Sequence, residues 1–218
     1  MKFKGFAGDE KMGKSAVSFV EDKLARFLVK LVPKWIQTYH LTLTTIFWSL
    51  LVIIFGYLSE KNINWLWGSS VMIICQYLTD LVDGKVGKQR NTGLIRWGYY
   101  MDHFLDYVFL CSILIGYSFI ITDFSRQLLF FILAIFGAFM VNSFLSFAAT
   151  NEFKIAYLKI GPTEVRILFV VINTLLIFGK VYAKFVIPYI LIFALLGLIV
   201  VVFRTQKYIW ELDMKRKK

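Results

Sequence analysis

Cysteine, histidine and charged residues are all scarce in this chain, and each scarcity argues against a class of protein. The two cysteines, Cys75 and Cys111, fall in apolar segments and indicate small buried residues rather than a disulfide framework or a thiol metal site. With two histidines in the whole chain, there is no Cys/His cluster for a soft metal ion. Only 18% of the residues are charged, against roughly a quarter in an average soluble domain.

Apolar residues are abundant instead. Of the 218 residues, 58% are hydrophobic, which is more apolar surface than one soluble core of this length can hide. Six apolar stretches approach the roughly 17–25 residues that cross a hydrocarbon core. They are 41–58, 65–82, 98–122, 128–150, 165–179 and 185–203. We therefore predict an all-α integral membrane protein, in which six transmembrane helices form one domain (41–204) between an N-terminal segment (1–40) and a basic tail (205–218).

A shorter apolar pattern precedes the first of these stretches. From Val17 to Trp35, apolar residues recur every three or four positions, basic residues occupy the opposite side, and Ser15 is a candidate N-cap. This pattern predicts an amphipathic helix in the headgroup plane that ends at Pro33 or soon after. A helix packed on the cytoplasmic ends of the bundle fits the pattern as well. At the other end of the chain, the lysine-rich last four residues are expected to fray.

The net charge of +11 is distributed unevenly between the two sides of the predicted membrane domain. With the N-terminus in the cytoplasm, 21 Lys and Arg residues fall in cytoplasmic segments, which are 1–40, 83–97, 151–166 and the tail from 204. The three opposite connections hold only four, Lys61, Arg126, Lys180 and Lys184. This asymmetry predicts that both termini are cytoplasmic. The basic charge therefore indicates topology and attraction to anionic membrane lipids rather than binding of nucleic acid.

Four aspartates mark the candidate site, at the end of the second predicted helix and the start of the third. They are Asp80, Asp83, Asp102 and Asp106. The spacings of three and four place each pair on one helix face, and a single cytoplasmic loop, 83–97, brings the pairs to similar depth. Four carboxylates at an apolar boundary repel one another, so a positive partner is expected. Mg²⁺ or Mn²⁺ is the natural candidate, because hard cations prefer carboxylate ligands and share them with substrate phosphates.

Glycines and lysines surround these aspartates. Gly84, Gly87 and Gly98 lack side chains where a bulky ligand would have to approach the helices closely. Lys85 and Lys88 can meet phosphate charge as point cations. The segment therefore has the composition expected of a site for a metal-bound, phosphate-containing ligand.

This pattern resembles the signature of the CDP-alcohol phosphatidyltransferases, D-x2-D-G-x2-A-R, then seven to nine residues, then G-x3-D-x3-D. All four aspartates match at the family's spacing, and so do Gly84 and Gly98. The A-R pair is replaced by Gly87 and Lys88. Because lysine keeps the charge but loses the bidentate fork of arginine, diphosphate binding by Lys88 is the weakest part of the match.

The resemblance implies a division of roles. Asp80, Asp83 and Asp102, with Asp106 nearby, would ligate two divalent ions that hold the CDP diphosphate. Asp106 would also be the general base that takes the proton of the acceptor hydroxyl. The glycines Gly84, Gly87 and Gly98, together with Lys88, would contact the CDP part. The implied reaction moves a phosphate-linked group from CDP-diacylglycerol or a CDP-amino alcohol to a lipid or small polar alcohol and releases CMP, and a homodimer is a further implication.

Three further residues, His103, Glu164 and Arg166, are possible contacts for the acceptor or for a phosphate, and each has another interpretation. His103 after Asp102 resembles the choline and ethanolamine phosphotransferase branch, as do Lys85 and the segment 161–164, or His103 is an interfacial side chain with one hydrogen bond. Arg166 could bind a phosphate of donor or acceptor, but we favour structural ion pairs of Glu164 and Arg166 at a helix mouth.

Polar residues in two other helices are also ambiguous. Asn142 and Ser146 either line an acceptor pocket or, as we favour, form interhelical hydrogen bonds. His40 either caps the first membrane helix or contacts the nucleotide.

Two other classes of protein compete with the enzyme. A cation-binding transporter would also carry intramembrane carboxylates, but usually near the midplane and on repeated, broken helices, neither of which this sequence indicates. A structural membrane scaffold would leave the aspartates and glycines without a purpose.

Overall fold

The computed structural model describes residues 18–92, 94–152, 161–179 and 183–216, and within them it contains helices and no strand. The elements are α1 (Ser18–Leu28), α2 (Thr38–Ser59), the 3-10 turn η2 (Ile63–Trp65), α3 (Leu66–Arg90), α4 (Ile95–Ile120), α5 (Asp123–Thr150), α6 (Pro162–Phe178) and α7 (Ala183–Arg216). Each of the six predicted apolar stretches corresponds to one of the helices α2 to α7.

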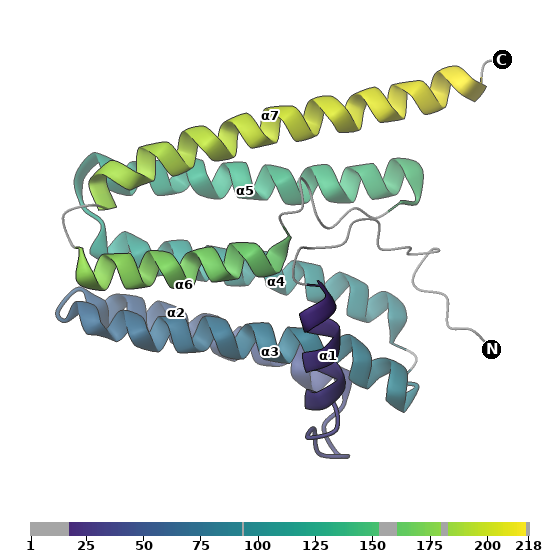
Figure 1. Cartoon of the computed structure of the whole chain (residues 1–218), viewed down its shortest axis with the longest axis horizontal. Helices are drawn as coiled ribbons and strands as arrows, with labels where there is room; N and C mark the ends of the chain where they lie inside the picture. The colour runs from purple at the N-terminus through teal and green to yellow at the C-terminus, as the bar shows by residue number, and fades with distance from the viewer. Residues whose placement is uncertain (1–17, 93, 153–160, 180–182, 217–218) are drawn as a thin grey trace.

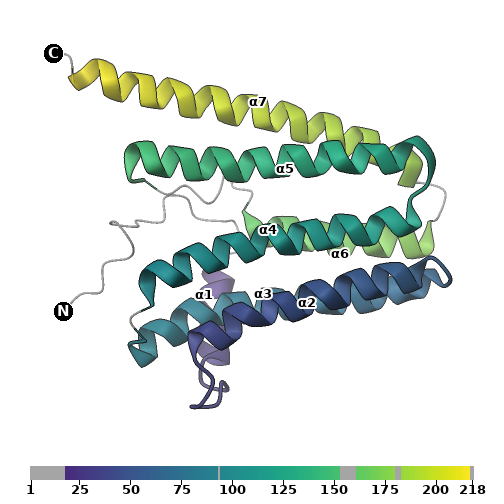
Figure 2. The same ribbon diagram turned by 180° about the vertical axis from the view of Figure 1, so that it is seen from behind.

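The six long helices run side by side in three layers (Figures 1 and 2). α2 packs on both α3 and α4, α6 packs on α3, and α5 pairs with α7 in the outer layer. The short α1 lies across α3 at the end of the bundle where α3 and α4 are joined. This arrangement brings α3, α4 and α6 together around the predicted site.

Four of the helices are long and apolar enough to cross a membrane, namely α2, α4, α5 and α7. α3 is long but carries the charged motif in its second half, and α6 has only 17 residues. The part of the chain that the structure describes is therefore all-helical, with four candidate spans of full length and two shorter or more polar helices packed among them.

The expected cytoplasmic loop 83–97 is mostly helical, which corrects the sequence prediction. α3 continues to Arg90, where Asn91 adopts the left-handed conformation that commonly ends helices. α4 already begins at Ile95, so only 91–94 link the two helices. Apolar periodicity predicts where a helix leaves the membrane rather than where it stops, because a helix can continue into water on its own hydrogen bonds.

The N-terminal helix is shorter than predicted. α1 ends at Leu28, and the next residues form tighter turns in which the N–H of Lys30 bonds to the carbonyl of Phe27 and the N–H of Leu31 to that of Leu28. Ala25 is fully buried, whereas Phe27 is 61% exposed, so α1 packs one face on the bundle and leaves other apolar side chains uncovered. The candidate N-cap Ser15 lies outside the described residues.

The predicted basic tail is helical as far as the structure describes it. α7 runs without a break through 205 to Arg216, and the division into a membrane domain (41–204) and a tail (205–218) stays a prediction. The predicted fraying therefore does not begin at 215, and the last two lysines, 217 and 218, lie outside the described residues.

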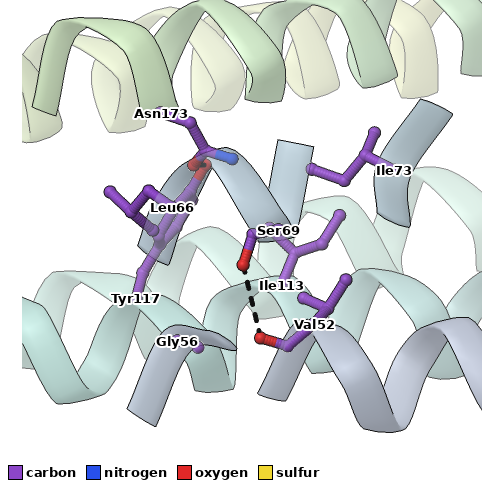
Figure 3. A pocket seen from close by; sticks show the side chains of 9 residues that line it. Val52, Gly56, Leu66, Ser69, Ile73, Ile113, Tyr117 and Asn173 are labelled. Carbon is purple, nitrogen blue, oxygen red and sulfur yellow. Dashed lines mark hydrogen bonds between the residues drawn. The ribbon is translucent and has the colours of Figure 1, made fainter. Parts of the chain in front are cut away.

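α2 and α4 pack closely where Gly56 meets Gly116. A Cβ atom added to Gly56 would come within 2.4 Å of the Cα of Gly116, so only glycine allows this crossing. Beside it, the Ser69 hydroxyl donates to the carbonyl of Val52 at 3.5 Å (Figure 3). The tight crossing holds α4, which carries two of the four aspartates, firmly against α2.

Candidate active site

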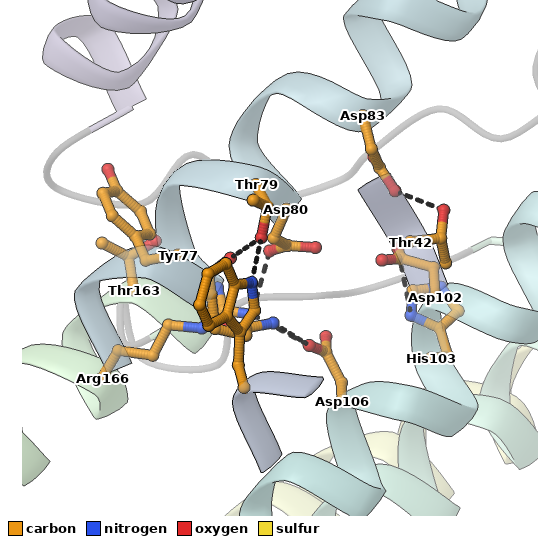
Figure 4. Close-up of polar contacts among 12 residues, drawn as sticks. Thr42, Tyr77, Thr79, Asp80, Asp83, Asp102, His103, Asp106, Thr163 and Arg166 are labelled. Atoms are coloured by element: carbon orange, nitrogen blue, oxygen red, sulfur yellow. Dashed lines mark hydrogen bonds and ion pairs between the residues drawn. The ribbon is translucent and has the colours of Figure 1, made fainter. Parts of the chain in front are cut away.

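Three of the four predicted aspartates meet between α3 and α4. Asp80 projects from α3, and Asp102 and Asp106 project from successive turns of α4 (Figure 4). One carboxylate oxygen from each lies within 4.8 Å of the others. Among the described residues, this is the group of His, Cys, Asp and Glu side chains that fits a metal ion.

Asp83 stands apart from this group. Its carboxylate accepts a hydrogen bond of 2.9 Å from the Thr42 hydroxyl on α2, and its backbone carbonyl accepts one from Thr38. Figure 4 shows Asp83 turned toward Thr42. The structure thus explains why threonines begin α2, although the sequence alone did not connect them with the aspartates.

Arg166 is the cation beside the carboxylates. Its Nη2 lies 2.9 Å from Asp80 Oδ2 and 2.9 Å from Asp106 Oδ1, and its side chain is only 10% exposed. The sequence predicted that Arg166 forms ion pairs at a helix mouth, but the partners are the catalytic candidates themselves. The guanidinium group of Arg166, which comes from a third helix, α6, therefore offsets part of the repulsion between the carboxylates of α3 and α4.

Glu164 has a different place. Its carboxylate accepts a 2.8 Å hydrogen bond from the backbone N–H of Gly161, and Pro162 occupies the first turn of α6. Both features stabilise a helix start. Glu164 thereby fixes the N-terminus of α6. Arg166 lies about one turn further along this helix and reaches the aspartates from there.

Gln76 belongs to the site but was missed by the sequence analysis. It lies one turn before Asp80 on α3, is 1% exposed, and its Nε2 is 3.4 Å from Asp106 Oδ1. A single glutamine in an apolar stretch carries no motif. The spacing of four to Asp80 is the one available signal, because it places both side chains on the same helix face.

The motif glycines differ in their surroundings. A Cβ atom on Gly84 or Gly98 would meet nothing within 4 Å, whereas one on Gly87 would lie 3.3 Å from the Thr38 hydroxyl. Open space at Gly84 and Gly98 agrees with the predicted approach of a ligand. Gly87 instead lies where α3 packs close to the start of α2.

The two lysines of the motif also differ in their surroundings. Lys88 is exposed, and Lys85 forms a 2.9 Å ion pair with Asp22 of α1. Lys85 thus fastens α1 to α3.

The two histidines have unlike roles. His40 accepts a 3.0 Å hydrogen bond at Nδ1 from the N–H of Gln37, so the structure shows the helix-capping alternative. His103 lies with Nδ1 3.9 Å from Asp102 Oδ2 and packs against the rings of Tyr99 and Phe144. His103 is thus at the edge of the site, in contact with one candidate ligand.

In the outer layer, Asn142 of α5 donates to the Thr205 hydroxyl of α7 at 3.4 Å, which is the interhelical bond favoured from the sequence. Ser146, one turn later, is buried.

A pocket of about 370 Å³ lies between α3 and α6 and reaches the site at Arg166. Its walls are mainly apolar side chains, Ile73, Ile74, Ile167, Val170 and Val171. Glu21 of α1 lines it too, and the carboxylate accepts hydrogen bonds from Thr163 of α6 and Tyr77 of α3. The pocket therefore connects an apolar space to Arg166, which pairs with Asp80 and Asp106. Its volume lies within the range of known ligand sites.

The comparison with known protein families decides to which family this chain belongs. The family profile described as CDP-alcohol phosphatidyltransferase matches residues 30–203, which is most of the chain and includes every aspartate of the site. The chain belongs to the CDP-alcohol phosphatidyltransferase family. Curated proteins and solved structures gave no match.

Membership of the CDP-alcohol phosphatidyltransferases places the chain among multi-pass membrane transferases of phospholipid synthesis that act on CDP-alcohols. It favours the enzyme over the transporter and the scaffold that the sequence left as alternatives. The oxygen-only group of Asp80, Asp102 and Asp106 suits a hard divalent ion, in keeping with a family that is typically metal-dependent.

Proposed function

We propose that this chain transfers a phosphate-linked group from a CDP-activated donor to the hydroxyl group of an acceptor alcohol and releases CMP. The observation that carries the proposal is the meeting of Asp80, Asp102 and Asp106 beside Arg166, within a chain of this family. Carboxylates and a cation at one point, next to open space at Gly84, form a site that can hold a diphosphate together with its metal ions.

In this proposal Asp80, Asp83 and Asp102 hold Mg²⁺ or Mn²⁺, with the Asp83 carboxylate oriented by Thr42, and Asp106 lies beside Asp80 and Asp102. Two ions are expected from the resemblance. The metal would supply charge neutralisation for the diphosphate of the donor and for the leaving CMP. The CDP part would lie over Gly84 and Gly98, where no side chain obstructs it, and within reach of the exposed Lys88.

Asp106 is the proposed general base. The acceptor oxygen attacks the phosphorus distal to cytidine, a new P–O bond forms, and the P–O bond to CMP breaks. The hydroxyl proton passes to the Asp106 carboxylate, and the bonding electrons of the broken bond leave with CMP. A base within hydrogen-bond reach raises the nucleophilicity of the alcohol, typically by 10²–10⁴-fold.

The proposed placement of the helices in the membrane would give both water-soluble and lipid substrates access to the site. We propose that α3 and α6 cross the membrane with the four full-length spans, because both lie within the bundle, which makes six spans with both termini in the cytoplasm. Water-soluble substrates would then reach the aspartates from the cytoplasm. A lipid substrate would enter sideways through the apolar pocket between α3 and α6.

The test is CMP release by the purified full-length chain in detergent with Mg²⁺, comparing CDP-diacylglycerol and CDP-amino alcohols over a panel of acceptors. We expect Asp106→Asn to lower kcat by at least about 10²-fold while leaving donor binding and folding intact, because it removes the base but keeps the shape. Asp213→Asn, an exposed aspartate on α7, is the matched control and should keep wild-type activity.

Robust transfer by Asp106→Asn would remove the base assignment. Absence of CMP release by the wild type with every donor would overturn the proposed reaction itself.

A further inference from the structure

Two buried amide side chains in the bundle are paired differently. Asn173 on α6 is completely buried and uses both ends of its amide, because its Oδ1 accepts from the Tyr117 hydroxyl at 2.8 Å and its Nδ2 donates to the Ser70 hydroxyl at 2.9 Å. Figure 3 shows Asn173 above Tyr117. This is the pairing expected of an amide whose purpose is to join helices.

Gln76 on α3 is almost as deeply buried, at 1% exposed, but uses only one end of its amide. Its Nε2 donates to Asp106 Oδ1, and its Oε1 has no hydrogen-bond partner among the described residues. An unpaired buried oxygen is costly. If Gln76 served only the stability of the fold, an apolar side chain of the same size would give at least the same stability at this position.

The one bond that Gln76 makes is directed at a specific atom. Asp106 Oδ1 receives Nε2 of Gln76 at 3.4 Å from α3 and Nη2 of Arg166 at 2.9 Å from α6. Oδ2 of Asp106 receives no hydrogen bond from the described residues. Two donors on different helices thus hold one oxygen of Asp106 and leave the other without a donor among the described residues. The 3.4 Å bond is long, as catalytic hydrogen bonds often are in ligand-free sites, where they tighten on substrate binding.

We propose that Gln76 is a positioning residue for the reaction, which orients the Asp106 carboxylate so that Oδ2 faces the acceptor hydroxyl. The inference rests on the proposed function of Asp106 as the base. Gln76 touches neither the donor nor the reacting phosphorus, so its effect appears in turnover rather than in donor binding. Partners that orient a functional side chain are typically worth 10–100-fold in activity.

The experiment compares Gln76→Met with the wild type in steady-state CMP release, using full-length chain in detergent and whichever CDP donor the wild type accepts. Methionine keeps the length and volume of the side chain but removes the amide. We expect kcat to fall about 10–100-fold, with the KM for the CDP donor within about twofold of wild type. The Tm should be unchanged or higher, because an unpaired buried oxygen is removed.

Asn173→Leu is the matched control, since it removes a buried amide from the same bundle away from the aspartates. It should lower the Tm but keep the kcat of the protein that remains folded. Gln76→Asn serves if the methionine variant does not fold, because it keeps the amide but shortens its reach and should lose kcat to a similar extent.

A kcat within twofold of wild type in Gln76→Met, or a loss of kcat that follows a loss of Tm as in Asn173→Leu, would overturn this inference alone. A wild type that releases no CMP from any donor would overturn the proposed function, and the role of Gln76 with it.

Discussion

Replacing Arg166 by methionine tests the electrostatics of the site directly. Arg166 is 10% exposed, and its two partners, Asp80 and Asp106, are each 22% exposed, so the ion pairs are mostly shielded from water. Removal of one partner from a buried ion pair typically costs about 3–5 kcal/mol, because the remaining charge is left uncompensated. At roughly 2–4 °C per kcal/mol for a chain of this size, the metal-free Tm should fall by about 6–20 °C.

Mg²⁺ should then restore much of the lost stability. An ion at about 100 times its Kd stabilises the folded state by about 2.7 kcal/mol, and in the variant no guanidinium group competes for Asp80 and Asp106. The Tm of Arg166→Met should therefore rise more with Mg²⁺ than the Tm of the wild type. Thermal unfolding of both proteins in detergent, with EDTA and with Mg²⁺, measures this difference without an activity assay.

Lys85→Met is the comparison variant. Lys85 also forms a 2.9 Å ion pair, but its side chain is 32% exposed and its partner Asp22 is 68% exposed. Exposed pairs contribute only about 0–1 kcal/mol, so its Tm should change little, and Mg²⁺ should raise this Tm by no more than it raises the Tm of the wild type. The reasoning would be refuted if Arg166→Met lost no more stability than Lys85→Met without metal, or if Mg²⁺ raised the two Tm values equally.

Two further predictions concern the helices around the site. Gly84→Val should leave the Tm nearly unchanged but raise the KM for the CDP donor, because the valine side chain would occupy the open space that we assign to the donor. Gly56→Ala should instead lower the free energy of unfolding by about 1–3 kcal/mol, because its methyl group would overpack against Gly116. The KM for the CDP donor discriminates between the two variants, since only Gly84→Val should raise it. Thr42→Val should cost about 1 kcal/mol and weaken Mg²⁺ binding in a calorimetric titration, because Asp83 loses the hydroxyl that orients its carboxylate; an unchanged metal affinity would count against Asp83 as a ligand.

Some features of the site were predictable because they depend on spacing along one helix. The intervals of three and four within the aspartate pairs place each pair on one face whatever the rest of the fold does. Asp80, Asp102 and Asp106 do meet as predicted. The position of Asp83 was not predictable, since its orientation depends on Thr42, 41 positions away on another helix.

The sequence by itself indicated a membrane as the surrounding medium, the six long helices, and which of those helices carry the four aspartates. Hydrophobic length and helical periodicity are local properties, and they led to α2–α7 and to the motif on α3 and α4. They also misplaced the ends of α1, α3 and α7, because hydrophobicity falls at the membrane boundary whereas a helix stops only where its hydrogen bonding is broken or capped.

Only the tertiary structure decided which polar groups serve those carboxylates. Arg166 and Gln76 reach the same oxygen of Asp106 from α6 and α3, separated by 90 positions in the chain, and no pattern within either helix indicates that meeting. The packing of α6 against α3, and of α4 against α2 at Gly56, produces it. Charges and hydrogen bonds act through distance in space, so the pairing of donors with the aspartates follows from helix packing and not from spacing in the sequence.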